Sequence, residues 1–295
     1  ILNQEFAVKE DDIYRINGPL DLTFLMKLYG IDGMDAHRYT PYRPQPVPGM
    51  NDEEDIFTQI RRGDILLHHP YMTFEPVIQF VNQAATDPDV LAIKQTLYRV
   101  SGNSPIIAAL IKAAENGKQV TVLVELKARF DEENNINWAK KLEHAGCHVI
   151  YGLTGLKTHC KILLVVRKEE GGIRRYLHMG TGNYNDSTAR FYTDIGMFTC
   201  KDLFGVDASS LFNVLTGYSI PPQYHKMIVA PGGMRSFFER MIRSETENAR
   251  KGLPSGITVK VNSLVDPEII RLLYEASQAG VEIKLIVRGI CCLIP

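Results

Sequence analysis

The chain has 295 residues, of which 45% are hydrophobic and 23% are charged, as is ordinary for a soluble globular protein. Lysine and arginine number 33 against 34 acidic residues, so a net charge of -1 gives no general attraction for nucleic acid. A polyanion would have to be met by a local cluster of cations. No apolar run approaches the ~20 residues of a membrane span. The start at Ile1 lacks a charged leader and an initiator methionine, so we expect a cytoplasmic fragment.

A proline-rich stretch, YTPYRPQPVPGM, indicates a linker near residue 46, because proline favours extended backbone and cannot join a central sheet. We predict that residues 1–45 end a preceding head domain and that residues 46–225 form the first catalytic domain. A second linker, IPPQYHK, lies near residue 221, and residues 226–295 would begin a second, truncated domain.

The segment ILLHHPYMTFEPV predicts a loop before a helix. His68, His69, Tyr71 and Thr73 would lie in that loop. Free backbone N–H groups at the start of the helix could bind an anion. A solvated loop with Thr73 as the helix cap is an equally good interpretation.

A strand–helix–strand pattern follows, with strands over 90–97 and 120–126 and a helix over 105–116 that Gly117 ends. Arg99 and Arg129 come just after the two strands. The carboxyl ends of strands are where ligands bind in open α/β sheets, and the arginine fork suits phosphate. A surface ion pair is the alternative for either arginine alone.

The remaining elements of the first domain alternate in the same way. We expect helices over 132–145 and 202–218, and strands over 148–151, 161–167 and 174–179. The five cysteines are odd in number and lack the spacing of a zinc site, so we predict buried, reduced thiols and no metal; they are Cys147, Cys160, Cys200, Cys291 and Cys292.

The run Gly155 to Lys161, GLKTHCK, places His159 and Lys161 at the start of a buried strand. Neutral imidazole is a nucleophile that can carry a phosphoryl group, and a lysine two residues on points to the same face. His-x-Lys alone would favour an ordinary strand start. The loop GTGNYN, which holds Asn183, follows closely and shifts that balance.

The segment ARFYTDIGMFTC adds Tyr192 and Asp194 near the start of another strand. Tyr192 could stack on an adenine, and Asp194 could orient the imidazole of His159. Simple core packing is the alternative for Tyr192.

The chain also repeats itself, because Ile106 to Leu126 matches Ile269 to Gly289 in helical and strand phase, 163 residues apart. Gly117 pairs with Gly280. The counterpart of His159 would fall beyond Pro295, so we expect that half of a two-lobed site is missing. A degenerate second copy is the alternative.

His-x-Lys followed by Gly-Thr-Gly-Asn resembles the phospholipase D superfamily, and the wider match resembles bacterial polyphosphate kinases of the first type. The matching segments are HHPYMTFEPV, IKQTLYR, ELKARFDEENNI, GLKTHCK, GTGNYN, ARFYTD, VNSLVD and IVRGICCLIP. The aspartate that the superfamily carries five residues after the lysine is Val166 here, which disfavours a phosphodiesterase. The resemblance implies a duplicated α/β fold, a phospholipase D-like mixed sheet flanked by helices, with the second copy truncated.

The resemblance also implies a reaction: reversible transfer of the terminal phosphate of ATP to inorganic polyphosphate through a phosphohistidine at His159. It implies Mg2+ as cofactor, with Arg99 and Arg129 at a magnesium–phosphate site, and Tyr192 and Arg288 at the nucleotide. Because arginine cannot ligate a cation, we expect these arginines to hold phosphate oxygens. A second essential histidine and a nucleotide-contacting asparagine of the family have no matching positions here, so we expect this chain by itself to be incomplete for catalysis.

The expected partners are therefore ATP or ADP and polyphosphate, without nucleic acid, and a homo-oligomer in the full-length form, with peripheral membrane association left open. Two other functions remain as alternatives. One is a phospholipase D-type phosphodiesterase or nuclease, and the other is a non-catalytic polyphosphate-binding module.

Overall fold

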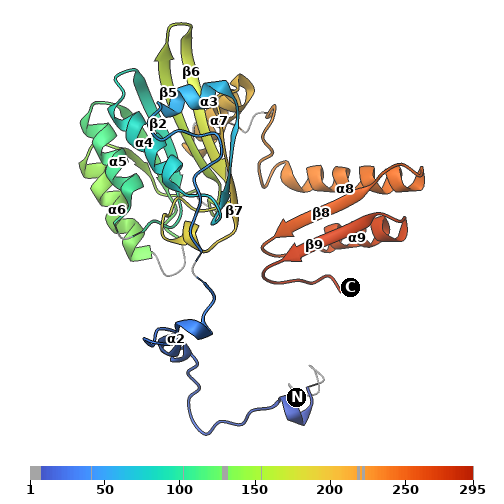
Figure 1. Ribbon diagram of the computed structural model, residues 1–295. Coiled ribbons are helices and arrows are strands. Elements are labelled where there is room, and N and C mark those ends of the chain that lie inside the picture. Colours follow the sequence, from blue (N-terminus) through green and yellow to red (C-terminus); the bar gives the residue numbers. More distant parts are fainter. Residues whose placement is uncertain are drawn as a thin grey trace. The chain divides into compact units, whose positions relative to one another are not determined.

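The computed structural model describes residues 8–40, 42–101, 103–127, 132–153, 155–217, 220 and 223–294 (Figure 1). The chain forms two compact units, residues 1–45 and 46–295, and each is described by itself. The first unit contains short helical elements: η1 (Glu10–Asp12), α2 (Leu25–Tyr29) and η2 (Asp35–His37). The three domains predicted from the sequence stay a prediction.

The second unit is built on a seven-stranded mixed sheet. Its strands run in the order β1-β7-β6-β5-β2-β3-β4. Their bounds are β1 (Ile65–His69), β2 (Val90–Leu97), β3 (Gln119–Val124), β4 (His148–Ile150), β5 (Lys161–Glu169), β6 (Gly172–Gly180) and β7 (Asp194–Thr199). β2, β3 and β4 pair in parallel, whereas the pairs β1–β7, β7–β6, β6–β5 and β5–β2 are antiparallel.

Helices cover both faces of this sheet. The helices α3 (Ile56–Arg62), α4 (Glu75–Thr86), α5 (Pro105–Glu115) and α6 (Glu132–His144) share one core, and α7 (Asp202–Leu215) packs on the opposite face. Because successive strand side chains point to opposite faces, Leu163 and Val165 of β5 join the first core while Ile162 and Leu164 join the α7 core. The predicted mixed sheet flanked by helices is confirmed.

Local sequence explains where α5 begins and ends. Pro105 occupies the first turn, and Ser104 accepts a hydrogen bond from the Ile107 N–H at 3.3 Å. At the other end Gly117 has φ 78°, a left-handed conformation that favours glycine. The predicted elements over 90–97, 105–116 and 120–126 are present with small shifts at their ends.

A second strand–helix–strand unit follows α8 (Met234–Arg250). It consists of β8 (Gly256–Val261), α9 (Pro267–Gln278) and β9 (Glu282–Val287), with β8 and β9 paired in parallel. Gly280 has φ 97° and stands at the same place as Gly117 of the first unit. The predicted repeat of this unit is therefore present in the fold.

Two local predictions were wrong. His68 and His69 lie in β1 rather than in a loop, because β1 pairs with β7 along its whole length. Of the cysteines only Cys147 is buried, and Cys160, Cys291 and Cys292 are exposed because they lie just outside the strands β5 and β9; all five are free thiols. Within the described ranges, no helix combines the length and apolar character that crossing a bilayer requires.

Candidate functional site

Strand pairing brings together, at one edge of the sheet, the ends of five strands: β1, β2, β5, β6 and β7. Because β2 and β5 are antiparallel, the carboxyl end of β2 meets the start of β5, which is also where β6 ends. Lys161 stands opposite Gly180, Gly180 opposite Gly196, and Asp194 opposite His69. This edge therefore gathers residues that are far apart in the sequence.

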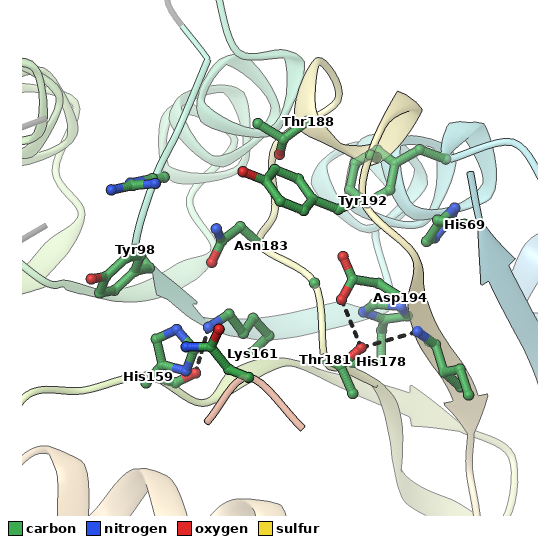
Figure 2. Close-up of a pocket in the computed structure, with 18 of the residues that line it drawn as sticks. His69, Tyr98, His159, Lys161, His178, Thr181, Asn183, Thr188, Tyr192 and Asp194 are labelled. Carbon is green, nitrogen blue, oxygen red and sulfur yellow. Dashed lines mark hydrogen bonds between the residues drawn. The ribbon is translucent and has the colours of Figure 1, made fainter. Parts of the chain in front are cut away.

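A cavity of about 320 Å³ opens at this edge (Figure 2). The lining includes three cations, three histidines and one carboxylate: Arg99, Lys161, Arg288, His69, His159, His178 and Asp194. Asn262 and Arg288 belong to the second strand–helix–strand unit, and the other residues belong to the first part of the compact unit. An excess of cations over carboxylates suits an anionic ligand.

His159 lies two residues before the start of β5 and lines the cavity, and the residue is exposed to solvent. Its ring meets that of Tyr98 edge to face, with ring centres 5.0 Å apart and planes at 81°. Partial burial of the ring, together with the charges of Lys161 and Lys157, lowers the pKa of His159 below its usual 6.5. The imidazole is therefore neutral near pH 7, the form that a nucleophile requires.

Lys161 is only 6% exposed, and its Nζ donates a hydrogen bond to the carbonyl oxygen of His159 at 2.7 Å. Burial lowers the pKa of Lys161 to about 8. Its Nζ lies 5.2 Å from the centre of the Tyr98 ring, and that of Lys157 lies 5.3 Å from the same ring. One tyrosine thus contacts the candidate nucleophile and both neighbouring lysines.

In the loop after β6, the Asp194 side chain lies so close to Gly182 that this position requires glycine. A Cβ on Gly182 would lie 2.7 Å from a carboxylate oxygen of Asp194, so only glycine fits beside that side chain. Thr181 Oγ1 donates to Asp194 at 2.9 Å and accepts from the Ile195 N–H at 3.0 Å (Figure 2). After Gly182, Asn183 has a buried Oδ1 that has no hydrogen-bond partner among the described residues, which leaves an acceptor in the cavity wall.

Asp194 lines the cavity beside the loop that follows β6. The hydrogen bonds found among the described residues do not include one between Asp194 and His159. Asp194 is instead held by Thr181 and pairs across the sheet with His69. The predicted orienting role of Asp194 toward His159 stays a prediction.

Tyr192 and Arg288 meet at the cavity. The guanidinium carbon of Arg288 lies 5.8 Å from the centre of the Tyr192 ring, and Tyr192 is 48% exposed. The Lys260 ammonium donates to the Thr193 carbonyl at 2.9 Å. The two residues predicted at the nucleotide are therefore neighbours, with an aromatic face and a cation side by side.

Of the two arginines predicted at the magnesium–phosphate site, Arg99 lines the cavity and its guanidinium carbon lies 6.0 Å from the Tyr98 ring centre. Arg129 lies outside the described residues. No group of three or more His, Cys, Asp or Glu side chains that could hold a metal occurs in the part of the chain that the structure describes. Those residues do not fit a magnesium ion held by protein ligands alone.

Sequence reasoning gave no catalytic or nucleotide-binding role to Tyr98, His69 and His178, which also line the cavity. Tyr98 was visible only as part of a motif, and its contact with His159 depends on the pairing of β2 with β5. His69 is 5% exposed and its Nδ1 lies 3.0 Å from the Met72 carbonyl oxygen. His178 is buried beside Tyr184, with Nδ1 2.9 Å from the tyrosine hydroxyl, and burial lowers the pKa of His178 to about 3. A neutral His178 is therefore a packed part of the wall.

Known proteins and family models match this chain over nearly its whole length. The model for polyphosphate kinase C-terminal domain 1 matches residues 55–221, and the model for C-terminal domain 2 matches residues 227–295. A polyphosphate kinase of Halalkalibacterium halodurans is 59% identical over 297 residues, and one of Lactiplantibacillus plantarum is 57% identical over 293 residues. These matches cover 100% and 99% of this chain but 42% and 41% of the relatives.

A solved structure agrees with the sequence relatives. The crystal structure of polyphosphate kinase from Porphyromonas gingivalis matches with a TM-score of 0.83 and 37% identity, over 95% of this chain and 47% of that chain. The chain thus spans less than half the length of these relatives. Because one family model covers more than half of its residues and the relatives align along its full length, the chain belongs to the polyphosphate kinase family.

Proposed function

We propose that this chain carries the phosphoryl-accepting part of a polyphosphate kinase, with His159 as the nucleophile. The observation that carries the proposal is the cavity itself, where a neutral imidazole lies among Lys161, Arg99 and Arg288. Phosphoryl transfer depends mainly on positioning and on neutralising charge, and this arrangement offers both. Family membership supports the same reaction class.

The proposed reaction has two balanced steps. A lone pair of the His159 imidazole forms a bond to the terminal phosphorus of ATP while the bond to the bridging oxygen breaks and ADP leaves with that electron pair. A terminal oxygen of polyphosphate then attacks the same phosphorus, and the nitrogen–phosphorus bond returns its electrons to the ring. Each step runs in either direction, so the transfer is reversible.

The neighbouring side chains would each act on the phosphate. Lys161 and Arg99 would neutralise the oxygens of the transferred group, as cations do in other phosphoryl-transfer sites. Asn183 would align a phosphate-bound water or hydroxyl through its unpartnered Oδ1. Asp194, fixed by Thr181, would hold the loop that carries Asn183 at the cavity.

The nucleotide would lie between Tyr192, just before β7, and Arg288, just after β9. Tyr192 would stack on the adenine and Arg288 would bind ATP phosphates through its planar fork. Arg99 would hold phosphate oxygens beside any magnesium, which would supply further neutralisation of the phosphate charge. Arg129 belongs to the same proposal by motif alone.

The proposal extends to expectations about the whole protein. They are a homo-oligomeric full-length form that acts on ATP or ADP and polyphosphate in the cytoplasm. Binding of nucleic acid is not part of the proposal, since a net charge of -1 provides no general attraction for it.

Labelling with radioactive ATP and magnesium tests the function. We expect acid-labile phosphate on the full-length protein that contains this chain and none on its His159→Ala variant. His148→Ala is the matched control, since His148 is an exposed histidine on β4 and should keep the label. Label that survives His159→Ala would contradict the phosphohistidine.

Two further assays distinguish the alternatives. Cleavage of bis(p-nitrophenyl) phosphate without nucleotide, lost on His159→Ala, would indicate a phosphodiesterase. Retention of polyphosphate by a chain that never labels would indicate a binding module.

A further inference from the structure

Two buried polar side chains outside the cavity lining hold the segments that meet at His159. Glu125 is 2% exposed and follows β3, and Asn135 is 0% exposed and lies in α6. Neither residue lines the cavity. Buried polar groups of this kind are kept where their hydrogen bonds fix neighbouring backbone.

Glu125 binds the backbone just before the candidate nucleophile. Its Oε2 accepts a hydrogen bond from the Thr158 N–H at 2.7 Å, and its Oε1 accepts one from the Lys127 N–H at 2.8 Å. Both carboxylate oxygens are therefore used, and one of them fixes the residue adjacent to His159. The bond joins segments 33 residues apart, so it depends on the tertiary fold.

Asn135 binds the other side of the same contact. Its Nδ2 donates to the Tyr98 carbonyl at 2.7 Å and to the Glu125 carbonyl at 2.9 Å. Tyr98 is the residue whose ring meets the His159 ring edge to face. One amide therefore links the backbone that carries Tyr98 to the residue that holds Thr158.

A third contact completes the support from β2. Thr96 Oγ1 donates to the Cys160 carbonyl at 2.8 Å and accepts from the Ile162 N–H at 3.1 Å. The backbone is thus fixed on both sides of His159, by Glu125 before it and by Thr96 after it. Without these bonds the exposed start of β5 would have its order only from strand pairing.

We propose that Glu125 and Asn135 are positioning residues that hold His159 against Tyr98 and keep the imidazole aimed into the cavity. The inference rests on the proposed role of His159 as the phosphoryl acceptor. Productive attack requires the reacting atoms to be aligned, and a displacement of about 1 Å can lower a rate by about 100-fold. The two residues act through Thr158 and Tyr98, without contact with the substrate.

The test uses Glu125→Gln, which keeps the size of the side chain but replaces one acceptor oxygen by an NH2 group. One of the two backbone N–H groups then loses its acceptor. We expect the His159 ring resonance in a histidine-labelled NMR spectrum to lose the shift caused by the Tyr98 ring. Labelling by ATP should fall by up to about 100-fold in rate, with the ATP concentration for half-saturation unchanged, because Tyr192 and Arg288 are untouched.

Asp207→Asn is the matched control for the NMR measurement. Asp207 is another buried carboxylate that accepts backbone hydrogen bonds, from the N–H groups of His225, Lys226 and Met227, and it lies outside the cavity lining. This substitution should leave the His159 resonance in place. Asn135→Ala should move the resonance in the same direction as Glu125→Gln.

Each outcome decides the inference. An unchanged His159 resonance in both folded variants, Glu125→Gln and Asn135→Ala, would overturn it. If both variants fail to fold, amide exchange of the wild-type chain decides: slow exchange at Thr158 supports the hold by Glu125, and exchange at the unprotected rate overturns it. A full-length wild-type protein that takes no label would refute the proposed function, while a moved resonance would still support the positioning role.

Discussion

The two strand–helix–strand units share a sequence pattern but differ in burial. In the first, β2 is buried on both faces over most of its length, because α3 to α6 cover one face of the sheet and α7 covers the other. In the second, residues of β8 and β9 alternate between exposed and half-buried. The same local unit therefore serves in one place as the centre of a large core and in the other as a half-covered layer.

The residues that follow the third element of each unit show the consequence. Glu125 follows β3, and Arg288 stands at the matching place after β9, 163 residues further along the chain. Glu125 is buried and binds backbone, whereas Arg288 is exposed and lies over Tyr192 at the cavity. The degree of burial decides whether a charged residue at this position supports the site or lies in its lining.

The largest expected effect comes from removing a cavity cation, and it should differ between Lys161 of the large sheet and Arg288 of the second strand–helix–strand unit. Lys161→Gln should slow labelling of His159 by ATP by about 100-fold, because it removes a buried charge beside the transferred phosphoryl group. Arg288→Gln should weaken it by about tenfold, since an exposed cation gains less from each hydrogen bond to phosphate. Initial rates of labelling measure both.

Their pH dependence separates the two cations further. Below about pH 8 Lys161 keeps its proton and its charge, and as pH rises through that value the charge is lost, so wild-type labelling should decline. Lys161→Arg should label across that range without the decline, because guanidinium stays protonated. A decline that persists in Lys161→Arg would assign it to another group.

A smaller effect is expected from matched core truncations in the two helices. Ile106 in α5 is 1% exposed, and its counterpart Ile269 in α9 is only partly buried. Ile106→Ala should lower the free energy of unfolding by about 3 kcal/mol, and Ile269→Ala by about 1 to 2 kcal/mol. Urea denaturation measures both, and equal losses would mean that the second unit is covered in solution.

The smallest effect should be the same in both units. Gly117 and Gly280 have φ 78° and 97°, and open space surrounds the position of a Cβ at each. Alanine at either position is strained by its backbone alone and should cost about 1 kcal/mol. Thermal melts of Gly117→Ala and Gly280→Ala should therefore show similar shifts, and a clear difference would break the local equivalence of the repeat.

Much of the fold could be predicted because its signals are local. Strand and helix periodicity located the elements from β2 to α7, and the two glycines marked the repeat. The prediction failed at His68 and His69, whose strand exists only because β7 pairs with it, and at Cys160, whose exposure depends on where β5 begins.

Residues of the candidate site could also be named from local motifs in the sequence. His159, Lys161, Asn183, Tyr192, Asp194, Arg99 and Arg288 were named from motifs, and all of them line the cavity. The contact expected between Asp194 and His159 does not appear among the described hydrogen bonds. Asp194 binds Thr181 instead, a partner that depends on how β6 and β7 meet.

The sequence by itself determined the elements, their ends at one sheet edge, and the residue types able to carry phosphoryl chemistry, since each depends on neighbours a few positions away. Only the tertiary structure decided what surrounds His159. Tyr98 contacts its ring, and Glu125 and Asn135 hold the neighbouring backbone at Thr158 and Tyr98, all through strand pairing and helix packing between segments dozens of residues apart. Such contacts leave no periodic mark in the chain, because they depend on which faces and ends the folded sheet brings together.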